Sequence, residues 1–202
     1  MGGPAASTAN TRPASSWRHL PNLLSTLRLL LALPVALAIG YRDYPAALVL
    51  AALAALSDAL DGFLARRFGW QTRLGGLLDP LADKLLLVGC FIALTYVGAV
   101  PLLLTLLVLA RDVVIVAGAI AWRLLLGPLT ARPSLLSKLN TLAQIALVLA
   151  VLVTLAWRDS APAVSWRGPV WAVGALTVAS GVDYVLRWGA RARRQLRQRS
   201  AA

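Results

Sequence analysis

Glutamate is absent from this chain of 202 residues, only one cysteine is present, and charged residues make up just 14% of the sequence. The single cysteine, Cys90, excludes an internal disulfide, and its place in an apolar run indicates a packing role. Soluble domains carry about 25% charged residues, whereas this chain is 59% apolar and has a mean hydropathy of +0.73. The shortage of charge therefore excludes an ordinary soluble domain and predicts an integral membrane protein.

The apolar runs repeatedly reach the roughly 20 residues that are needed to cross a bilayer. We predict an all-α, polytopic membrane protein with six transmembrane helices, at residues 22–40, 45–66, 76–97, 100–123, 137–157 and 169–188. Residues 1–16 are rich in Ala, Ser, Thr, Asn and Pro and are expected to form a disordered tail. The membrane domain is then residues 17–190, followed by a basic cytoplasmic tail at residues 191–202.

The net charge of +12 suits a polyanionic partner, and the predicted spans favour anionic membrane lipids over nucleic acid. An even number of spans puts both termini on one side. Of the Arg and Lys residues in the loops and toward the span ends, fifteen lie on the side of the termini and three on the other side. Because cytoplasmic loops are enriched in Arg and Lys, this places the termini in the cytoplasm. Arg12 and Arg18 are too sparse for an organelle leader, so we expect the inner membrane of a bacterium.

Four of the eight acidic residues gather in one 26-residue window, D-A-L-D-G-F-L-A-R-R-F-G-W-Q-T-R-L-G-G-L-L-D-P-L-A-D. Asp58 and Asp61 are three residues apart, and Asp79 and Asp83 are four apart. Each pair therefore shares one face of a helix, and the four side chains are expected to converge. An aspartate at the centre of a membrane costs about 2.5–3.5 kcal/mol, so cations must offset this group. Neighbouring bases are one solution, but only a bound ligand also explains the small residues on the same faces. The acids are Asp58, Asp61, Asp79 and Asp83; the bases are Arg66, Arg67, Arg73 and Lys84; the small residues are Gly62, Ala65 and Gly75.

Carboxylate oxygens without histidine or cysteine suit hard cations, so we expect Mg²⁺ or Mn²⁺, and four acids can support a pair of ions. Two metal ions can hold a diphosphate and leave one carboxylate to take a proton from an attacking hydroxyl. The chain also lacks a P-loop and a Gly-rich dinucleotide turn, so metal and arginine would hold that diphosphate. The window therefore predicts a metal site for phosphoryl chemistry near the cytoplasmic ends of the second and third helices.

The same window resembles the signature of the CDP-alcohol phosphotransferases, D-x2-D-G-x2-A-R-x8-G-x3-D-x3-D, at every fixed position. The resemblance implies a six-helix membrane enzyme, commonly a homodimer, that transfers a phosphatidyl or related group from a CDP-linked donor to an alcohol and releases CMP. It implies that Asp58, Asp61 and Asp79 bind metal, and that Asp83 contacts the second metal and serves as general base. The donor-binding residues that it implies are Asn22, in the looser match P-N-L-L-S-T-L-R, and Gly62, Ala65, Arg66, Thr72 and Gly75.

Two branches of that family are similar to most of residues 20–155: the cardiolipin synthases and the phosphatidylglycerophosphate synthases. The segments L-A-R-D-V-V-I-V-A-G and P-S-L-L-S-K-L-N-T-L-A-Q are more similar to the cardiolipin synthases. Glycerophosphate users tend to carry a second lysine in place of Asn140, and a neutral residue suits a singly charged diester better than a dianionic monoester. We therefore expect transfer from CDP-diacylglycerol to phosphatidylglycerol, with glycerol 3-phosphate as the alternative acceptor. The expected acceptor contacts are Arg28, Arg111, Lys138 and Asn140.

Several of these assignments have a structural alternative. Arg111 and Asp112 can pair with each other inside the fourth span, and Asn140 and Gln144 can form hydrogen bonds between helices. For the whole chain the remote alternative is a cation-coupled transporter, because acids within spans often mark ion pathways. The acids gather toward one membrane face, however, and no paired interrupted helices are evident, so we favour an enzyme.

Overall fold

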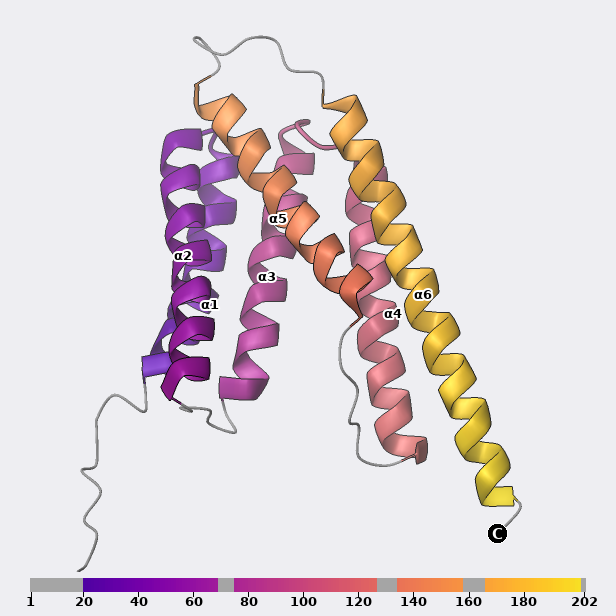
Figure 1. The fold of residues 1–202 in the computed structure, drawn as a ribbon. Coiled ribbons are helices and arrows are strands. Elements are labelled where there is room, and N and C mark those ends of the chain that lie inside the picture. Colours follow the sequence, from indigo (N-terminus) through magenta and orange to yellow (C-terminus); the bar gives the residue numbers. More distant parts are fainter. Residues whose placement is uncertain (1–19, 69–74, 127–133, 158–165, 201–202) are drawn as a thin grey trace, which may run out of the picture.

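A computed structural model of the chain describes residues 20–68, 75–126, 134–157 and 166–200, and these residues form six α-helices. The helices alternate in direction, so that α1 begins, α2 ends and α3 begins at the same end of the molecule (Figure 1). This confirms the all-α prediction for the described residues, and each predicted span coincides with one helix. The helices are α1 (Leu20–Gly40), α2 (Tyr44–Phe68), α3 (Gly75–Tyr96), α4 (Leu102–Leu126), α5 (Leu135–Ala156) and α6 (Arg167–Ser200).

The last helix is longer than the sequence predicted. The predicted span ended at residue 188 and a separate tail began at residue 191, whereas α6 continues to Ser200. Hydropathy marks where a helix leaves the apolar layer, but Ala, Arg, Gln and Leu favour the helix on either side of that limit. The basic segment is therefore a helical extension as far as Ser200. The predicted tail at residues 1–16 lies outside the described residues.

Three helices contain stretches that are long and apolar enough to cross a bilayer: Leu102–Leu124, Leu135–Ala156 and Arg167–Arg194. In the described parts of α1, α2 and α3 the apolar stretches are shorter. Large apolar side chains nevertheless cover the outer surface of these helices too, and Leu30 and Leu33 of α1 are 66% and 65% exposed. Apolar exposure on this scale is typical of a surface that contacts lipid.

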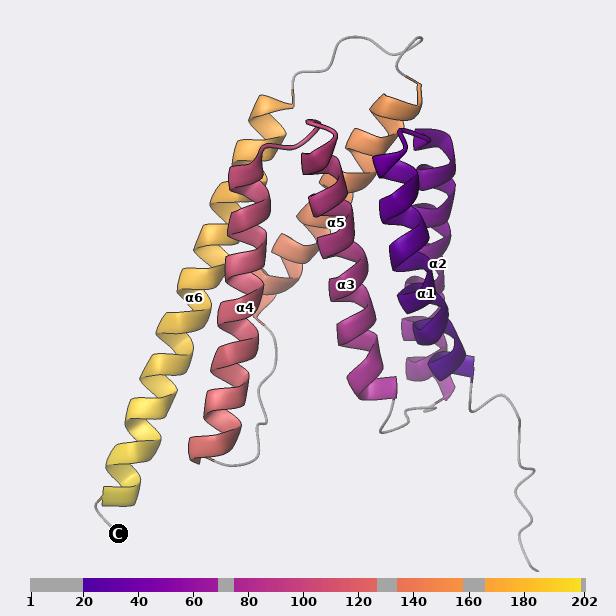
Figure 2. The ribbon, with the colours of Figure 1, turned by 180° about the vertical axis from the view of Figure 1, so that it is seen from behind.

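Helix α5 joins two groups of helices. α1 packs against α2 and α3, and α4 packs against α6, while α5 crosses obliquely and contacts α2, α3 and α6 (Figures 1 and 2). A Cβ atom at Gly89 would lie 3.7 Å from the Ala32 carbonyl oxygen, so this glycine helps α1 and α3 to approach closely. Cys90 is a buried free thiol, which confirms its packing role. The core also includes Val35, Ile39, Phe91, Leu94, Val108, Val151 and Leu152.

Candidate active site

The signature acids lie on two helices whose ends share one side of the molecule. Asp58 and Asp61 belong to the second half of α2, and Asp79 and Asp83 to the first half of α3. Because both segments are helical, spacings of three and four residues place the members of each pair on one side of their helix. The structure therefore supports the predicted placement on helices. The side chains lie outside the described set, so their convergence on metal ions stays a prediction.

The predicted donor contacts that fall within the described helices lie toward the same end of the molecule. α1, which carries Asn22, begins at this end (Figure 2), and Gly75 is the first residue of α3. Thr72 lies outside the described residues. Among the side chains that are described, which exclude the four acids, no three His, Cys, Asp or Glu residues gather as a metal site. The remaining predicted donor contacts, Gly62, Ala65 and Arg66, lie in α2.

A buried ion-pair network begins one residue after Asp83. Lys84 Nζ of α3 forms an ion pair with Asp112 Oδ1 of α4, and Arg111 Nη1 donates to the same oxygen at 2.8 Å. Arg111 and Asp112 are only 6% and 7% exposed. The pairing of Arg111 with Asp112, which the sequence left open, is thus confirmed. One buried carboxylate offsets two cations, and the charge that remains is positive.

Arg111 extends this network to two further helices, α5 and α6. Its Nη2 donates to Ser137 Oγ of α5 at 2.5 Å and to Ser180 Oγ of α6 at 3.2 Å. Gly181 lies beside the arginine stem, because a Cβ atom there would be 3.6 Å from Arg111 Cγ. The five residues Lys84, Arg111, Asp112, Ser137 and Ser180, here called the polar network, therefore connect α3, α4, α5 and α6.

Asn140 lies in a second buried group, between α5 and α6. Thr177 Oγ1 donates to Asn140 Oδ1 at 2.9 Å, and Gln144 Nε2 donates to Thr177 Oγ1 at 3.1 Å. None of the three side chains is more than 1% exposed. The interhelical role that the sequence left open for both amides is thus confirmed. Contact between Asn140 and an acceptor stays a prediction. The atom available for it is Nδ2, which is buried and has no hydrogen-bond partner among the described residues.

The other two predicted acceptor contacts differ in exposure. Arg28 of α1 is 1% exposed, whereas Lys138 is exposed in the first turn of α5, directly after Ser137 of the polar network. The structure thus brings Arg111 to the start of α5, near the backbone that carries Lys138. Asp183, to which the sequence assigned no role, pairs with Arg187 one turn later in α6, at 2.5 Å.

Sequence reasoning missed most of the polar network as a unit. Lys84 and Asp112 had a detectable signal, because a charge within a predicted span needs a partner. The sequence did not say that they are partners of each other. Ser137 and Ser180 had no such signal, since serine is common in membrane helices as a packing residue.

Two pairs of aspartates thus lie on two helices, α2 and α3, next in sequence to a buried network of net positive charge, in an all-helical chain with apolar, membrane-like helices. The family model of the CDP-alcohol phosphatidyltransferases matches residues 18–185. The chain therefore belongs to the CDP-alcohol phosphatidyltransferase family.

Curated relatives carry more than one activity in their names. The chain is 38% identical over 168 residues to a cardiolipin synthase (CMP-forming) of Rattus norvegicus, which covers 74% of this chain and 56% of that protein. It is 37% identical over 126 residues to a CDP-diacylglycerol–glycerol-3-phosphate 3-phosphatidyltransferase of Aquifex aeolicus, covering 61% and 70%. It is 35% identical over 178 residues to a probable phosphatidylglycerophosphate synthase of Mycobacterium tuberculosis, covering 84% and 81%. The chain spans about half the length of the mammalian relatives that it matches.

Proposed function

We propose that this protein transfers a phosphatidyl group from CDP-diacylglycerol to a hydroxyl of phosphatidylglycerol, which yields cardiolipin and CMP. The observation that carries the proposal is the complete eight-position signature between Asp58 and Asp83, placed on two helices of a chain that belongs to this family. The signature supports transfer from a CDP-linked donor. The choice of acceptor rests on other residues.

The donor set of the signature fits hard divalent cations, because it offers carboxylate oxygens alone. We propose that Asp58, Asp61, Asp79 and Asp83 hold two Mg²⁺ or Mn²⁺ ions, whose chemistry is to neutralise charge on the diphosphate. Asn22, Gly62, Ala65, Arg66, Thr72 and Gly75 would contact the CDP portion of the donor.

In the proposed reaction Asp83 accepts the proton of the acceptor hydroxyl. The hydroxyl oxygen forms a bond to the phosphorus that carries diacylglycerol, and the bond between this phosphorus and the CMP oxygen breaks. CMP leaves with the electron pair of that bond. No covalent enzyme intermediate is needed, because the acceptor itself is the nucleophile.

Phosphatidylglycerol is the proposed acceptor because Asn140 is neutral and lies where glycerol 3-phosphate users tend to carry a lysine. The structure adds that this side chain is fully buried and hydrogen bonded, so the surroundings suit an amide. The positive charges of Arg28, Arg111 and Lys138 would complement the single negative charge of a phosphodiester. Glycerol 3-phosphate is the second candidate, favoured by the name of the Aquifex aeolicus relative.

We propose further that all six helices cross the membrane, with both termini and the signature acids on the cytoplasmic side of a bacterial inner membrane. The fifteen to three division of Arg and Lys supports this orientation. Anionic lipids would surround the basic extension of α6, and a homodimer is the proposed assembly.

The test is an acceptor competition with the purified chain. CDP-diacylglycerol and Mn²⁺ are supplied with phosphatidylglycerol, with glycerol 3-phosphate, or with neither, while CMP release and lipid products are measured by mass spectrometry. We expect cardiolipin and an equal amount of CMP with phosphatidylglycerol. A strong preference for glycerol 3-phosphate would show that it, and not phosphatidylglycerol, is the acceptor. Cation flux in vesicles without any CMP release would favour a transporter.

A further inference from the structure

A cavity of about 420 Å³ lies between α4, α6 and the turn at residues 97–101. This is the opposite end of the molecule from the signature acids, where α3 ends and α4 and α6 begin (Figure 1). The volume lies within the range of roughly 300–1,000 Å³ that is typical of small-molecule sites. The cavity therefore needs an explanation other than the proposed reaction.

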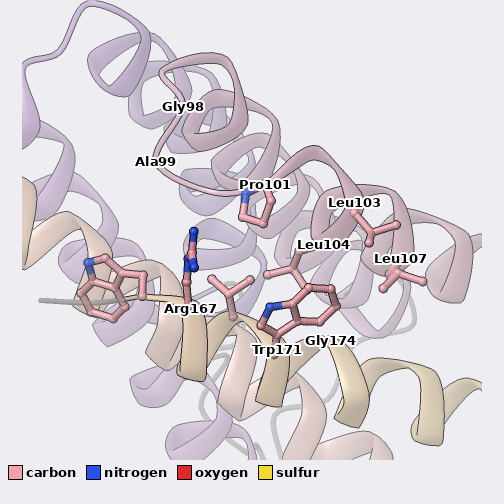
Figure 3. A pocket seen from close by; sticks show the side chains of 11 residues that line it. Gly98, Ala99, Pro101, Leu103, Leu104, Leu107, Arg167, Trp171 and Gly174 are labelled. Atoms are coloured by element: carbon pink, nitrogen blue, oxygen red, sulfur yellow. The ribbon is translucent and has the colours of Figure 1, made fainter.

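The lining of the cavity is apolar apart from one cation. Leu103, Leu104 and Leu107 of α4 face Trp171 of α6, and Arg167 extends from the start of α6 toward the turn (Figure 3). At the turn, Gly98 has a φ of 77° and a Cβ atom there would meet nothing within 4 Å, so the wall is open on this side. A cavity with this lining does not favour water.

Arg167 lies at the boundary of the apolar layer. The apolar stretch of α6 begins at this residue, and Trp166 and Trp171 lie on either side of it. Tryptophan and arginine near the end of a span are typical of the level of lipid headgroups. Within the described ranges, Arg167 has no ion pair and no side-chain hydrogen bond, so its charge is open to a ligand.

The geometry points to a binding site for an anionic phospholipid, with the phosphate at Arg167 and part of an acyl chain in the cavity beside Leu103 and Trp171. A membrane phospholipid matches both the cation and the apolar lining of the cavity. Its phosphodiester complements the guanidinium, and its acyl chain complements the leucines. The site is independent of the proposed reaction, since it requires only a surrounding membrane.

The experiment is native mass spectrometry of the full chain released from mild detergent, with added phosphatidylserine or phosphatidylcholine. Neither lipid is a proposed substrate. We expect wild type to retain phosphatidylserine in preference to phosphatidylcholine, and Arg167→Ala to bind phosphatidylserine about fivefold more weakly, as loss of one cation near an anionic lipid implies. Leu103→Trp, which fills the cavity without changing charge, should lower the retention of both lipids.

The matched control is Arg42→Asn at the same end of the molecule. Arg42 is exposed and has a φ of 63°, a conformation that asparagine tolerates well. This variant removes a cation away from the cavity and should retain lipid as wild type does. Equal retention by wild type and Arg167→Ala would overturn the proposal, as would equal losses in both arginine variants. If the spectra instead show a protein dimer without bound lipid, and Leu103→Trp weakens that dimer, the cavity is a contact with a second copy of the chain and the lipid proposal is wrong.

Discussion

Asp112 offers the sharpest test of how the buried charges support the reaction. Its Oδ1 accepts from both Lys84 and Arg111, so Asp112→Asn removes the only negative charge of the polar network while keeping its shape. Removing one partner of a buried ion pair costs about 3–5 kcal/mol. Because the Lys84 side chain is 35% exposed and can still be hydrated, we expect the lower end, about 3 kcal/mol of unfolding free energy.

The same substitution should slow turnover. Lys84 directly follows Asp83, the proposed base, and loss of its partner on α4 frees this turn of α3. A displacement of about 1 Å in a catalytic group can cost about 100-fold in rate, so we expect a loss of that order in kcat with little change in the KM for CDP-diacylglycerol. Asp112→Glu, which keeps the charge, should recover part of the rate.

The assays are CMP release for kcat and KM, and equilibrium unfolding in mixed micelles for stability. Asp183→Asn is the matched control, because this acid pairs within α6 with Arg187, whose side chain is 60% exposed. Such a pair is worth about 0.3–0.5 kcal/mol, and the control should keep full turnover. If the Asp112 and Asp183 variants behave alike in both assays, the reasoning about the polar network is wrong.

Three further outcomes are expected. Asp83→Asn should abolish CMP release while binding of CDP-diacylglycerol is largely kept, since the base is lost and three metal ligands stay; full activity would refute its role. Gly118→Ala should lower stability by about 1–3 kcal/mol in a thermal unfolding assay, because the new Cβ atom would lie 3.0 Å from the Tyr184 ring. Gly174→Ala, with its nearest atom at 3.7 Å, should be nearly neutral, and equal losses would contradict the packing. Thr177→Val should cost about 1 kcal/mol by leaving two buried amides without their shared hydroxyl, whereas Thr177→Ser should not.

Several features of the site could be predicted from the sequence because they depend on local rules. The spacing of Asp58 from Asp61 needed only a helix to place both residues on one side, and α2 provides it. The family followed from eight positions within one window. The end of α6 could not be predicted from hydropathy, since an arginine-rich segment leaves the apolar layer without leaving the helix.

The partners of Lys84, Arg111 and Asn140 required the packed structure. Lys84 and Asp112 are 28 residues apart, and Arg111 and Ser180 are 69 apart. Hydropathy and motif spacing describe each helix alone, and they contain no information on how one helix is rotated and shifted against the next. Those two quantities are set by close contacts such as that of Gly89 with α1 and Gly181 with Arg111, and they decide which buried polar groups meet.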